Sequence, residues 1–320
     1  EFWDKKKLKT LEPKVVLGAS GKDRAENIVA MGAKAGQSYT TIDFGKMSEN
    51  LVENALKEKK KAFVAYNQEV SQIVQKDGVF YLYTKSYEEF VAKAVVVNAG
   101  AHSLYLAHKM GLGLDKSCVP VAGSFYITRQ KLLRGKVYTV QNPKLPFAAL
   151  HGDPDLLANM NTRFGPTALV IPKLERYHGL KSMPEFFEAL KFDTQVAKIM
   201  LGVLKDSVVR NYILYNYLFE IPFINKRLFV KGVQKIVPSL KASDIAYANG
   251  FGGVRPQVID KKAGALVFGE ASINEKGIIF NMTPSPGATS CLGNAKKDAQ
   301  SVCKYLGAKF DEDKFKKELG

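Results

Sequence analysis

The sequence is poor in cysteine and has no long apolar run. Its three cysteines, Cys118, Cys291 and Cys303, are an odd number without metal-ligand spacing, so we expect neither a disulfide framework nor a metal site. No 18-residue apolar stretch free of charge is present, which excludes a transmembrane helix by length. No secretory signal pattern occurs either. These absences predict a protein of a reducing, cytoplasmic compartment. Any contact with a membrane would then be peripheral and on its cytoplasmic face.

Acidic residues are scarce relative to basic ones. The chain has 31 Asp and Glu against 47 Lys and Arg, for a formal net charge of +16. A basic surface favours anionic partners such as nucleic acid, anionic lipid or an anionic substrate. No zinc-finger, RNA-recognition or helix-turn-helix pattern is present, so nucleic acid is not an expected partner. The lysines are spread along the whole chain, so a lysine-rich composition without functional meaning is the alternative.

A strand, a loop of small residues and a helix follow one another near the C-terminus. Ile278–Phe280 is an apolar strand, Pro284–Gly287 is a loop, and a helix is predicted to begin near Ala288–Ser290 and to continue to Tyr305. The start of such a helix carries partial positive charge and exposed N–H groups, which attract an anion or an electron-rich ring. An ordinary strand-to-helix turn is the alternative.

A second junction of the same kind lies near residue 100. The apolar run Ala92–Asn98 is typical of a buried parallel strand, and it enters the small-residue turn Asn98–Ser103 before a predicted helix, Ser103–Met110. Two strand–turn–helix junctions in one chain are typical of a nucleotide-binding sheet, in which ligands bind at the carboxyl ends of the strands.

The rest of the chain mixes helical and extended patterns. An amphipathic helix is predicted over residues 43–60, and the turn Lys76–Gly78 predicts a hairpin between strands 69–74 and 79–84. Residues 150–155 contain Gly, Asp and Pro and are predicted to form a turn-rich, polar stretch. Further strands are predicted over residues 14–18, 63–66, 119–128 and 137–140.

Residues 184–220 form the most helical part of the sequence and carry a cluster of aromatic residues. Tyr212, Tyr215 and Tyr217 lie close together, and the basic pair Lys226-Arg227 follows. Aromatic rings beside cations are typical of a surface that faces a membrane. A helix with one buried and one solvated face is the alternative.

Five segments stand in a characteristic order along the chain: the helix 43–60, the strand Val70–Val74, the run Val95–Ser103, the turn Gly253–Pro256 and the segment Pro284–Ala295. This order resembles that of FAD-dependent oxidoreductases of the D-amino-acid-oxidase-like superfamily. Within the superfamily, Pro120–Phe125, Arg163–Thr167 and Val254–Gln257 resemble malate:quinone oxidoreductase. The L-2-hydroxyglutarate dehydrogenases have a similar layout and are the alternative.

The resemblance implies a mixed α/β fold. We expect an incomplete, discontinuous FAD-binding Rossmann-like domain over residues 1–115 and 261–320, with an antiparallel-sheet substrate domain inserted over residues 116–260. The implied activity is oxidation of L-malate to oxaloacetate, with non-covalent FAD as cofactor and electrons passed to a membrane quinone. A non-catalytic basic binding protein on the same fold is the alternative from another functional class.

The sequence departs from the family in one respect. The strand–Gly-x-Gly-x-x-Gly–helix unit that holds the FAD pyrophosphate is absent, and Gly18–Gly21 has the wrong spacing to replace it. We therefore interpret the chain as a fragment that lacks the N-terminal part of its flavin domain. By itself it is expected to bind FAD poorly and to be inactive.

Three residues are candidates for the substrate chemistry that the resemblance implies. Arg255 precedes Pro256 in a glycine-rich turn, and Arg163 precedes Phe164; either guanidinium could pair bidentately with a carboxylate of malate. His151 is the candidate base, because histidine titrates near neutrality. Structural roles are the alternative for each of them.

For FAD, the resemblance implies contacts from both junctions. Val70 would meet the adenosine side through its backbone, Asn98, Ala99 and Gly100 would pack near the ribose or pyrophosphate, and His102 would lie nearer the cofactor than the substrate. Pro284 belongs to the segment expected to cover the redox-active ring. The residues expected to approach the flavin pyrimidine through backbone N–H groups are Gly287, Ala288, Thr289 and Ser290.

Overall fold

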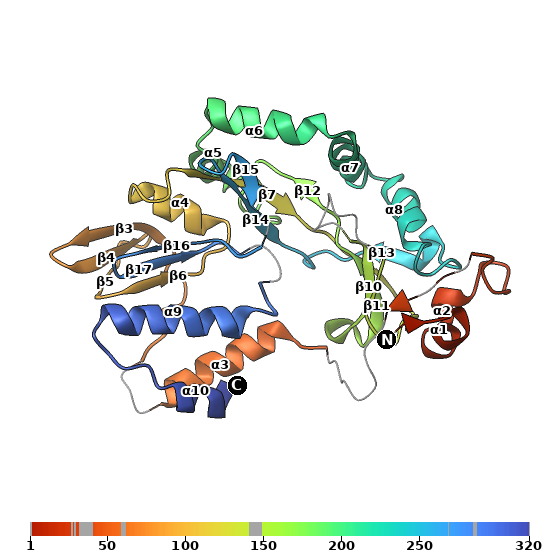
Figure 1. The fold of residues 1–320 in the computed structure, drawn as a ribbon, viewed down its shortest axis with the longest axis horizontal. Helices are drawn as coiled ribbons and strands as arrows, with labels where there is room; N and C mark the ends of the chain where they lie inside the picture. Colours follow the sequence, from red (N-terminus) through yellow and green to blue (C-terminus); the bar gives the residue numbers. More distant parts are fainter. Residues whose placement is uncertain are drawn as a thin grey trace. The chain divides into compact units, whose positions relative to one another are not determined.

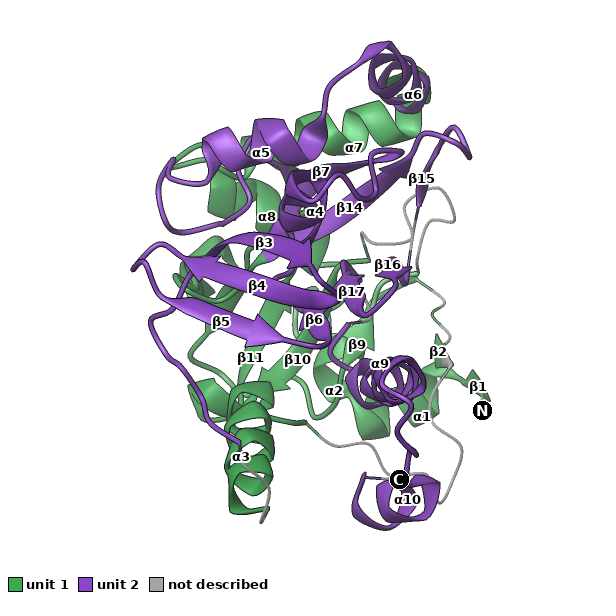
Figure 2. Cartoon of the chain, turned by 90° about the vertical axis from the view of Figure 1, so that its left-hand side faces the viewer, with its two compact units in different colours: residues 1–60, 122–169, 204–253 green, residues 61–121, 170–203, 254–320 purple. Residues whose placement is uncertain are grey.

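The computed structural model describes residues 2–26, 28, 30–31, 41–58, 62–140, 149–267, 269–283 and 287–319 (Figure 1). The chain passes repeatedly between two compact units (Figure 2). Unit 1 comprises residues 1–60, 122–169 and 204–253, and unit 2 comprises residues 61–121, 170–203 and 254–320. Helices and strands occur in both, so the expected mixed α/β class is confirmed.

The two predicted strand–turn–helix junctions lie side by side in unit 2. Strand β6 (Val95–Val97) precedes helix α4 (His102–Lys109), and strand β17 (Ile278–Asn281) precedes helix α9 (Cys291–Tyr305). The two strands pair in parallel, with Ile278 opposite Val95. Because their carboxyl ends meet at one edge of the sheet, both junctions open onto the same edge. Figure 1 shows α4 on one side of this sheet and α9 on the other.

A three-stranded antiparallel sheet accompanies the parallel pair in unit 2. It consists of β3 (Val70–Lys76), β4 (Val79–Thr84) and β5 (Glu89–Ala92). Asp77 and Gly78 between β3 and β4 both have positive φ, as a two-residue hairpin turn requires, so the predicted hairpin is confirmed. The prediction of one strand over Ala92–Asn98 was wrong, because β5 and β6 pair in different sheets and a bend separates them.

The other elements of unit 2 and the two sheets pack around one apolar core. Strand β16 (Ser272–Glu275) pairs with β17, and a third sheet has the order β12-β7-β14-β15. The large side chains of Phe80, Leu104 and Phe280 are fully buried in this core. The remaining elements of the third sheet and its surroundings are β12 (Leu169–Val170), β7 (Lys116–Ala122), β14 (Val254–Asp260), β15 (Ala265–Val267), α5 (Met183–Leu190), α6 (Thr194–Lys205) and α10 (Glu312–Leu319).

Unit 1 is built on one antiparallel sheet with the order β13-β8-β11-β10-β9. Helix α8 (Asn225–Val233) packs on it, and the ring of Phe229 stacks on the buried ring of Tyr126 with centroids 4.2 Å apart. The strands are β13 (Ile245–Tyr247), β8 (Tyr126–Thr128), β11 (Asn161–Gly165), β10 (His151–Asp155) and β9 (Val137–Tyr138). The other elements of unit 1 are α1 (Lys5–Leu11), α2 (Pro13–Val16), α3 (Phe44–Lys57), α7 (Ser207–Leu218), β1 (Phe2–Trp3), β2 (Ala30–Met31) and the short 3-10 turns Leu156–Ala158 and Ala242–Asp244.

Several sequence-based predictions need correction in unit 1. Residues 14–18 do not form a strand: Pro13 opens the short helix α2, since its fixed φ suits a first helical turn, and Val16 is buried in the core. Residues 151–155 form strand β10 and not a turn. The helix over 43–60 is confirmed as α3, whose first turn is capped by the Asp43 carboxylate accepting from the Lys46 N–H at 3.0 Å.

Two other predicted strands are shorter than the sequence suggested, or absent. Residues 63–66 form no strand, and the run 119–128 is divided between β7 and β8. Residues 123–125 separate these two strands, which belong to different sheets. Among the described residues, no helix combines the length and apolar character that crossing a membrane requires.

Candidate functional site

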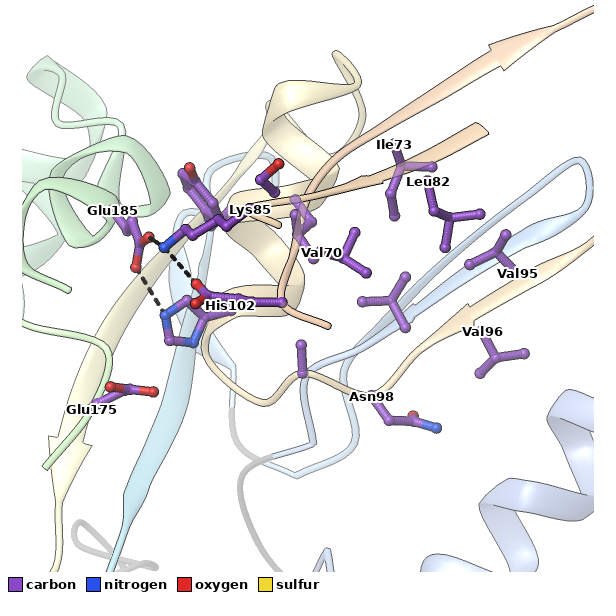
Figure 3. Close-up of a pocket in the computed structure, with 16 residues that line it drawn as sticks. Val70, Ile73, Leu82, Lys85, Val95, Val96, Asn98, His102, Glu175 and Glu185 are labelled. Atoms are coloured by element: carbon purple, nitrogen blue, oxygen red, sulfur yellow. Dashed lines mark hydrogen bonds and ion pairs between the residues drawn. The ribbon is translucent and has the colours of Figure 1, made fainter. Parts of the chain in front are cut away.

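A cavity of about 410 Å³ lies in unit 2 beside the edge where the two junctions open (Figure 3). Three residues predicted to bind the cofactor, Val70, Asn98 and Ala99, line it together with His102. Gly100, the third predicted residue of the turn after β6, follows Ala99 with a φ of +57°, a left-handed conformation that glycine adopts without strain. The structure therefore brings Val70, Asn98 and Ala99 to one cavity, whereas Gly100 is not among the lining residues.

The cavity has an apolar side and a charged side. Figure 3 shows Ile73, Leu82 and Val95 at one end, with Lys85 and Glu185 at the other. Such a division suits a ligand with a flat apolar body and polar edges. The full set of lining residues is Glu69, Val70, Ser71, Ile73, Leu82, Lys85, Val95, Val96, Val97, Asn98, Ala99, His102, Tyr105, Leu106, Glu175 and Glu185.

The charged side of the cavity is a connected network. His102 Nε2 lies 3.0 Å from Glu185 Oε2, and Lys85 Nζ lies 3.5 Å from the other oxygen of Glu185 and 2.5 Å from Glu69 Oε1. The hydrogen bond to Glu69 raises the pKa of Lys85. Sequence reasoning missed Lys85, Glu69 and Glu185, because about a hundred residues separate Lys85 from Glu185 and no local pattern links them.

Polar side chains connect the two junctions to each other. Asn281, the last residue of β17, donates from Nδ2 to Asn98 Oδ1 at 2.8 Å and to Asp298 Oδ2 at 2.6 Å. The Ala99 N–H donates to Ser103 Oγ at 3.0 Å, which closes the turn before α4. The turn after β6 is thus fixed to the strand and the helix of the second junction. Asn281 and Asp298 were not among the predicted residues.

The second junction supplies the start of α9. Gly287, Ala288, Thr289 and Ser290 form a turn directly before the helix, which begins at Cys291. Ser290 Oγ accepts from the Asn294 side-chain amide at 3.3 Å. The predicted helix is confirmed, whereas Pro284 lies outside the described residues. The N-terminus of α9 therefore lies at the junction, where partial positive charge favours an anionic group.

His151 and Arg163 lie on neighbouring strands of unit 1. Arg163 is opposite Asp153 in the register of β10 and β11. Its Nη2 lies 3.1 Å from Asp153 Oδ2, its Nη1 lies 2.6 Å from Asp155 Oδ2, and its guanidinium lies over the Phe125 ring at 4.6 Å. Two internal carboxylates therefore already neutralise Arg163, which makes it less suited to clamp a substrate carboxylate than to hold this strand pair.

His151 is held as a neutral imidazole. Its Nδ1 lies 3.3 Å from the Ala149 carbonyl oxygen; since a carbonyl only accepts, Nδ1 carries the hydrogen and Nε2 presents a lone pair. The ring lies beside Tyr138, with centroids 4.8 Å apart. Burial, assisted by the positive charge of Lys136, lowers the pKa of His151 from its ordinary value to about 4. A neutral side chain with a free lone pair can accept a proton.

The lowered pKa of His151 predicts a pH dependence of stability. The unfolded chain takes up a proton near pH 6.5, whereas the folded chain resists protonation down to about pH 4. Stability is therefore fully present above about pH 6.5 and falls by up to about 3 kcal/mol as the pH decreases to about 4. Urea unfolding of the chain and of His151→Gln across this range measures the effect. Equal pH dependence in the two proteins would contradict it.

Arg255 is the second residue of β14 and is half-buried. It belongs to unit 2, whereas His151 and Arg163 belong to unit 1. The glycine-rich stretch before it includes Gly250, which has positive φ. No group of three His, Cys, Asp or Glu side chains in the described part of the chain is arranged to hold a metal ion.

Comparison with known proteins gives one consistent result. Residues 2–300 match the family described as malate:quinone oxidoreductase (Mqo). The chain is 70% identical, over its whole length, to the probable malate:quinone oxidoreductase of Campylobacter jejuni subsp. jejuni and spans 72% of that protein. It is 51% identical, again over its whole length, to the malate:quinone oxidoreductase of Helicobacter pylori (strain 26695) and spans 71% of it.

A solved structure extends the comparison to the fold. The chain superposes with a TM-score of 0.59 and 19% identity on the L-α-glycerophosphate oxidase of Mycoplasma pneumoniae with FAD bound, covering 97% of this chain and 65% of that one. At this identity the likeness concerns the fold alone. The family model and the two relatives together give the assignment: this chain belongs to the malate:quinone oxidoreductase family.

Proposed function

We propose that the chain supports flavin-dependent oxidation of L-malate to oxaloacetate, with the electrons passed to a membrane quinone. Family membership across residues 2–300 carries the proposal, and the parallel pairing of β6 with β17 supports it, because it brings both junctions to one ligand-binding edge. The comparisons do not favour 2-hydroxyglutarate as substrate or a non-catalytic binding protein. Cofactor binding by residues 1–115 and 261–320, with substrate binding by residues 116–260, is part of the proposal.

The cavity of unit 2 fits the adenosine half of FAD. Ile73, Leu82 and Val95 offer an apolar wall to a flat ring, and carboxylates at the other side can accept hydrogen bonds from ribose hydroxyls. Glu69 and Glu185 would repel a pyrophosphate, so the phosphates belong elsewhere. The N-terminus of α9 suits the electron-rich edge of the flavin. When bound, FAD supplies the acceptor for the hydride removed from malate.

We expect the 320-residue chain by itself to retain well under one FAD per chain. Gly18–Gly21, the nearest approach to a phosphate loop, forms a tight turn in which the Gly18 N–H donates to the Lys22 carbonyl, and the described residues 22–26 that follow it are not helical. The strongest phosphate contacts of a dinucleotide fold are therefore missing from these residues. Flavin absorbance after gel filtration with excess FAD measures the stoichiometry, and one FAD per chain would contradict the prediction.

Activity is best tested in a chimaera. The C. jejuni relative shares 70% identity along all of this chain and is longer than it, so the 320 residues can replace the aligned part of that relative. The proposal predicts that the chimaera binds FAD and reduces a quinone in a malate-dependent reaction. The relative itself is the control for assembly and for assay conditions. A folded, flavin-loaded chimaera that leaves malate unoxidised would disprove the proposed function.

The proposed proton acceptor is His151. Oxidation of malate breaks the C2–H and O–H bonds of the alcohol. The C2–H electron pair leaves as a hydride, for which bound FAD would be the acceptor, the O–H electron pair forms the carbonyl double bond, and the hydroxyl proton must go to a base. His151 Nε2 offers the lone pair for that proton. The negative charge of a bound dicarboxylate would raise the pKa of His151 from about 4 toward neutrality, which makes proton transfer to the ring more favourable.

A quinone acceptor implies contact with a membrane surface, since quinones of this kind are apolar and partition into lipid. We therefore propose that the protein is cytoplasmic and binds the cytoplasmic face of the membrane peripherally. The net charge of +16 supports attraction to anionic lipid headgroups. Nucleic acid is not part of the proposal.

A further inference from the structure

Helix α7 of unit 1, labelled in Figure 1, buries one face and leaves apolar residues exposed on the opposite face. Its inward face is fixed by Asn216, which is buried, accepts from the Ala168 N–H at 2.8 Å and donates to the Tyr212 carbonyl at 2.8 Å. Val209, Tyr212 and Ile213 are half-buried on the same face, at the spacing of helix neighbours. The other side of α7 must therefore face outward.

The outward side of α7 consists mostly of apolar residues. Leu214 is 58% exposed, and Arg210 is the one charged residue in the sequence of this helix. A helix that faces water on one side normally carries polar residues there. The exposed apolar residues of α7 are Val208, Leu214, Tyr215, Tyr217 and Leu218.

The apolar surface continues into the segment that joins α7 to α8. Ile221 and Ile224 are exposed, and Phe223 is 92% exposed. Phe223 also has a φ of +71°, a conformation that is costly for a bulky residue. An aromatic ring exposed to water contributes no burial free energy that would offset the unfavourable backbone conformation. A partner that covers the segment would explain why the ring is held there.

The sequence around this apolar surface is rich in basic residues. Between Leu204 and Lys235 the sequence has six basic and two acidic residues, a local charge of +4. Lys226 and Arg227 lie two and three positions after Ile224, and Arg227 is exposed. Within the described residues no ion pair involves these cations. The basic residues are Lys205, Arg210, Lys226, Arg227, Lys231 and Lys235, and the acidic ones are Asp206 and Glu220.

We propose that the outward side of α7 together with residues 219–227, the α7–α8 surface, docks on an anionic lipid surface. Exposed leucine, isoleucine and aromatic side chains would enter the headgroup region while the neighbouring cations contact anionic headgroups. A second copy of the chain fits less well, because two surfaces of local charge +4 repel each other. The proposal gives a location to the membrane contact proposed above and rests on that proposed function.

The test uses the chain with sedimented vesicles of phosphatidylcholine, with or without phosphatidylglycerol. We expect binding to the anionic vesicles that weakens as salt rises. Phe223→Asn should lower the partition coefficient about tenfold, since burial of this ring is lost. Asparagine tolerates the left-handed backbone, so the variant should fold. Tyr87→Asn is the matched control, because Tyr87 is 99% exposed with a φ of +67° on a hairpin of unit 2.

Reversing two charges tests the electrostatic part. Lys226→Glu combined with Arg227→Glu should lower binding to anionic vesicles at least tenfold, at about 1 kcal/mol for each basic residue near the surface. The control is Lys304→Glu combined with Lys309→Glu, two exposed lysines of unit 2, which should have a much smaller effect.

Three results would overturn the docking proposal. They are equal binding to neutral and anionic vesicles, equal behaviour of Phe223→Asn and Tyr87→Asn, and self-association abolished by Phe223→Asn without any lipid binding. These arms need neither flavin nor malate. If the chain binds anionic vesicles as expected while the chimaera oxidises no malate, only the proposed function is disproved. If the chimaera is active but the vesicle results differ from those expected, only the docking surface is disproved.

Discussion

Replacing His151 by glutamine is expected to lower malate-dependent turnover of the chimaera by about 10²–10⁴-fold, the usual contribution of a positioned proton acceptor. Glutamine keeps the volume and polarity of the side chain but has no basic lone pair. Because His151 is half-buried between Tyr138 and Phe125, the variant must first be shown to retain flavin and to melt normally at neutral pH. Turnover with an artificial acceptor dye then isolates the oxidation of malate from the reduction of quinone.

The pH profile separates a base from a structural histidine. If His151 accepts the proton, kcat/KM of the chimaera should fall only as the pH decreases toward the low pKa of the free side chain, about 4. The acid limb should be missing from the residual activity of His151→Gln. An unchanged profile, or a loss of less than about threefold in turnover, would assign the base to another residue.

The second large effect is expected at Arg255. Replacement by methionine should lower kcat/KM for malate by about 10²–10⁴-fold, because two charge-assisted hydrogen bonds to a carboxylate contribute roughly 1.5–3 kcal/mol each. Arg255→Lys should lie in between, since an ammonium keeps the charge but loses the planar fork. Arg163 is a weaker candidate for this contact, because its guanidinium pairs with Asp153 and Asp155.

Arg129→Met is the control for Arg255→Met, because Arg129 is exposed in unit 1 and its loss should leave kcat/KM nearly unchanged. Equal effects of the two substitutions would remove Arg255 from the substrate site. If Arg255→Met melts at a lower temperature but has normal kinetics at low temperature, Arg255 has a structural role instead.

Local patterns predicted the parts of the fold that local physics determines. The helix over 43–60 was evident from its amphipathic pattern, and the hairpin of β3 and β4 from the Lys76–Gly78 turn. The apolar runs that became β6 and β17, each followed by small residues and a helix, indicated a ligand-binding sheet edge before any pairing was known.

The errors have a different cause. Strand β10 was predicted to be a turn, because Gly152, Asp153 and Pro154 are unfavourable in strands as single residues. The pairing of Asp153 and Asp155 with Arg163 on the neighbouring strand compensates for this composition, and it follows from a register that one sequence does not reveal. Helix α2 was predicted to be a strand because its valines are β-branched, yet Pro13 starts a helix there.

Only part of the cofactor cavity was predicted, because some of its residues adjoin local sequence patterns and others do not. Val70, Asn98 and Ala99 adjoin recognisable turns and strands, so a family resemblance could locate them. The ion network of Lys85 with Glu185 unites residues a hundred positions apart, and the link from Asn281 to Asn98 spans still more of the chain. Contacts of this kind depend on tertiary packing and leave no periodic signal.

The proposed reaction has malate as the reductant and quinone as the acceptor, and one measurement tests both. Purified chimaera is mixed with vesicles that contain a quinone, and the initial rate of quinone reduction is followed with L-malate or L-2-hydroxyglutarate as substrate. We expect rapid reduction of the quinone with malate and a rate at least tenfold lower with 2-hydroxyglutarate, whose extra methylene misplaces one carboxylate. Equal or faster reduction with 2-hydroxyglutarate, or none with malate in a flavin-loaded protein, would contradict it.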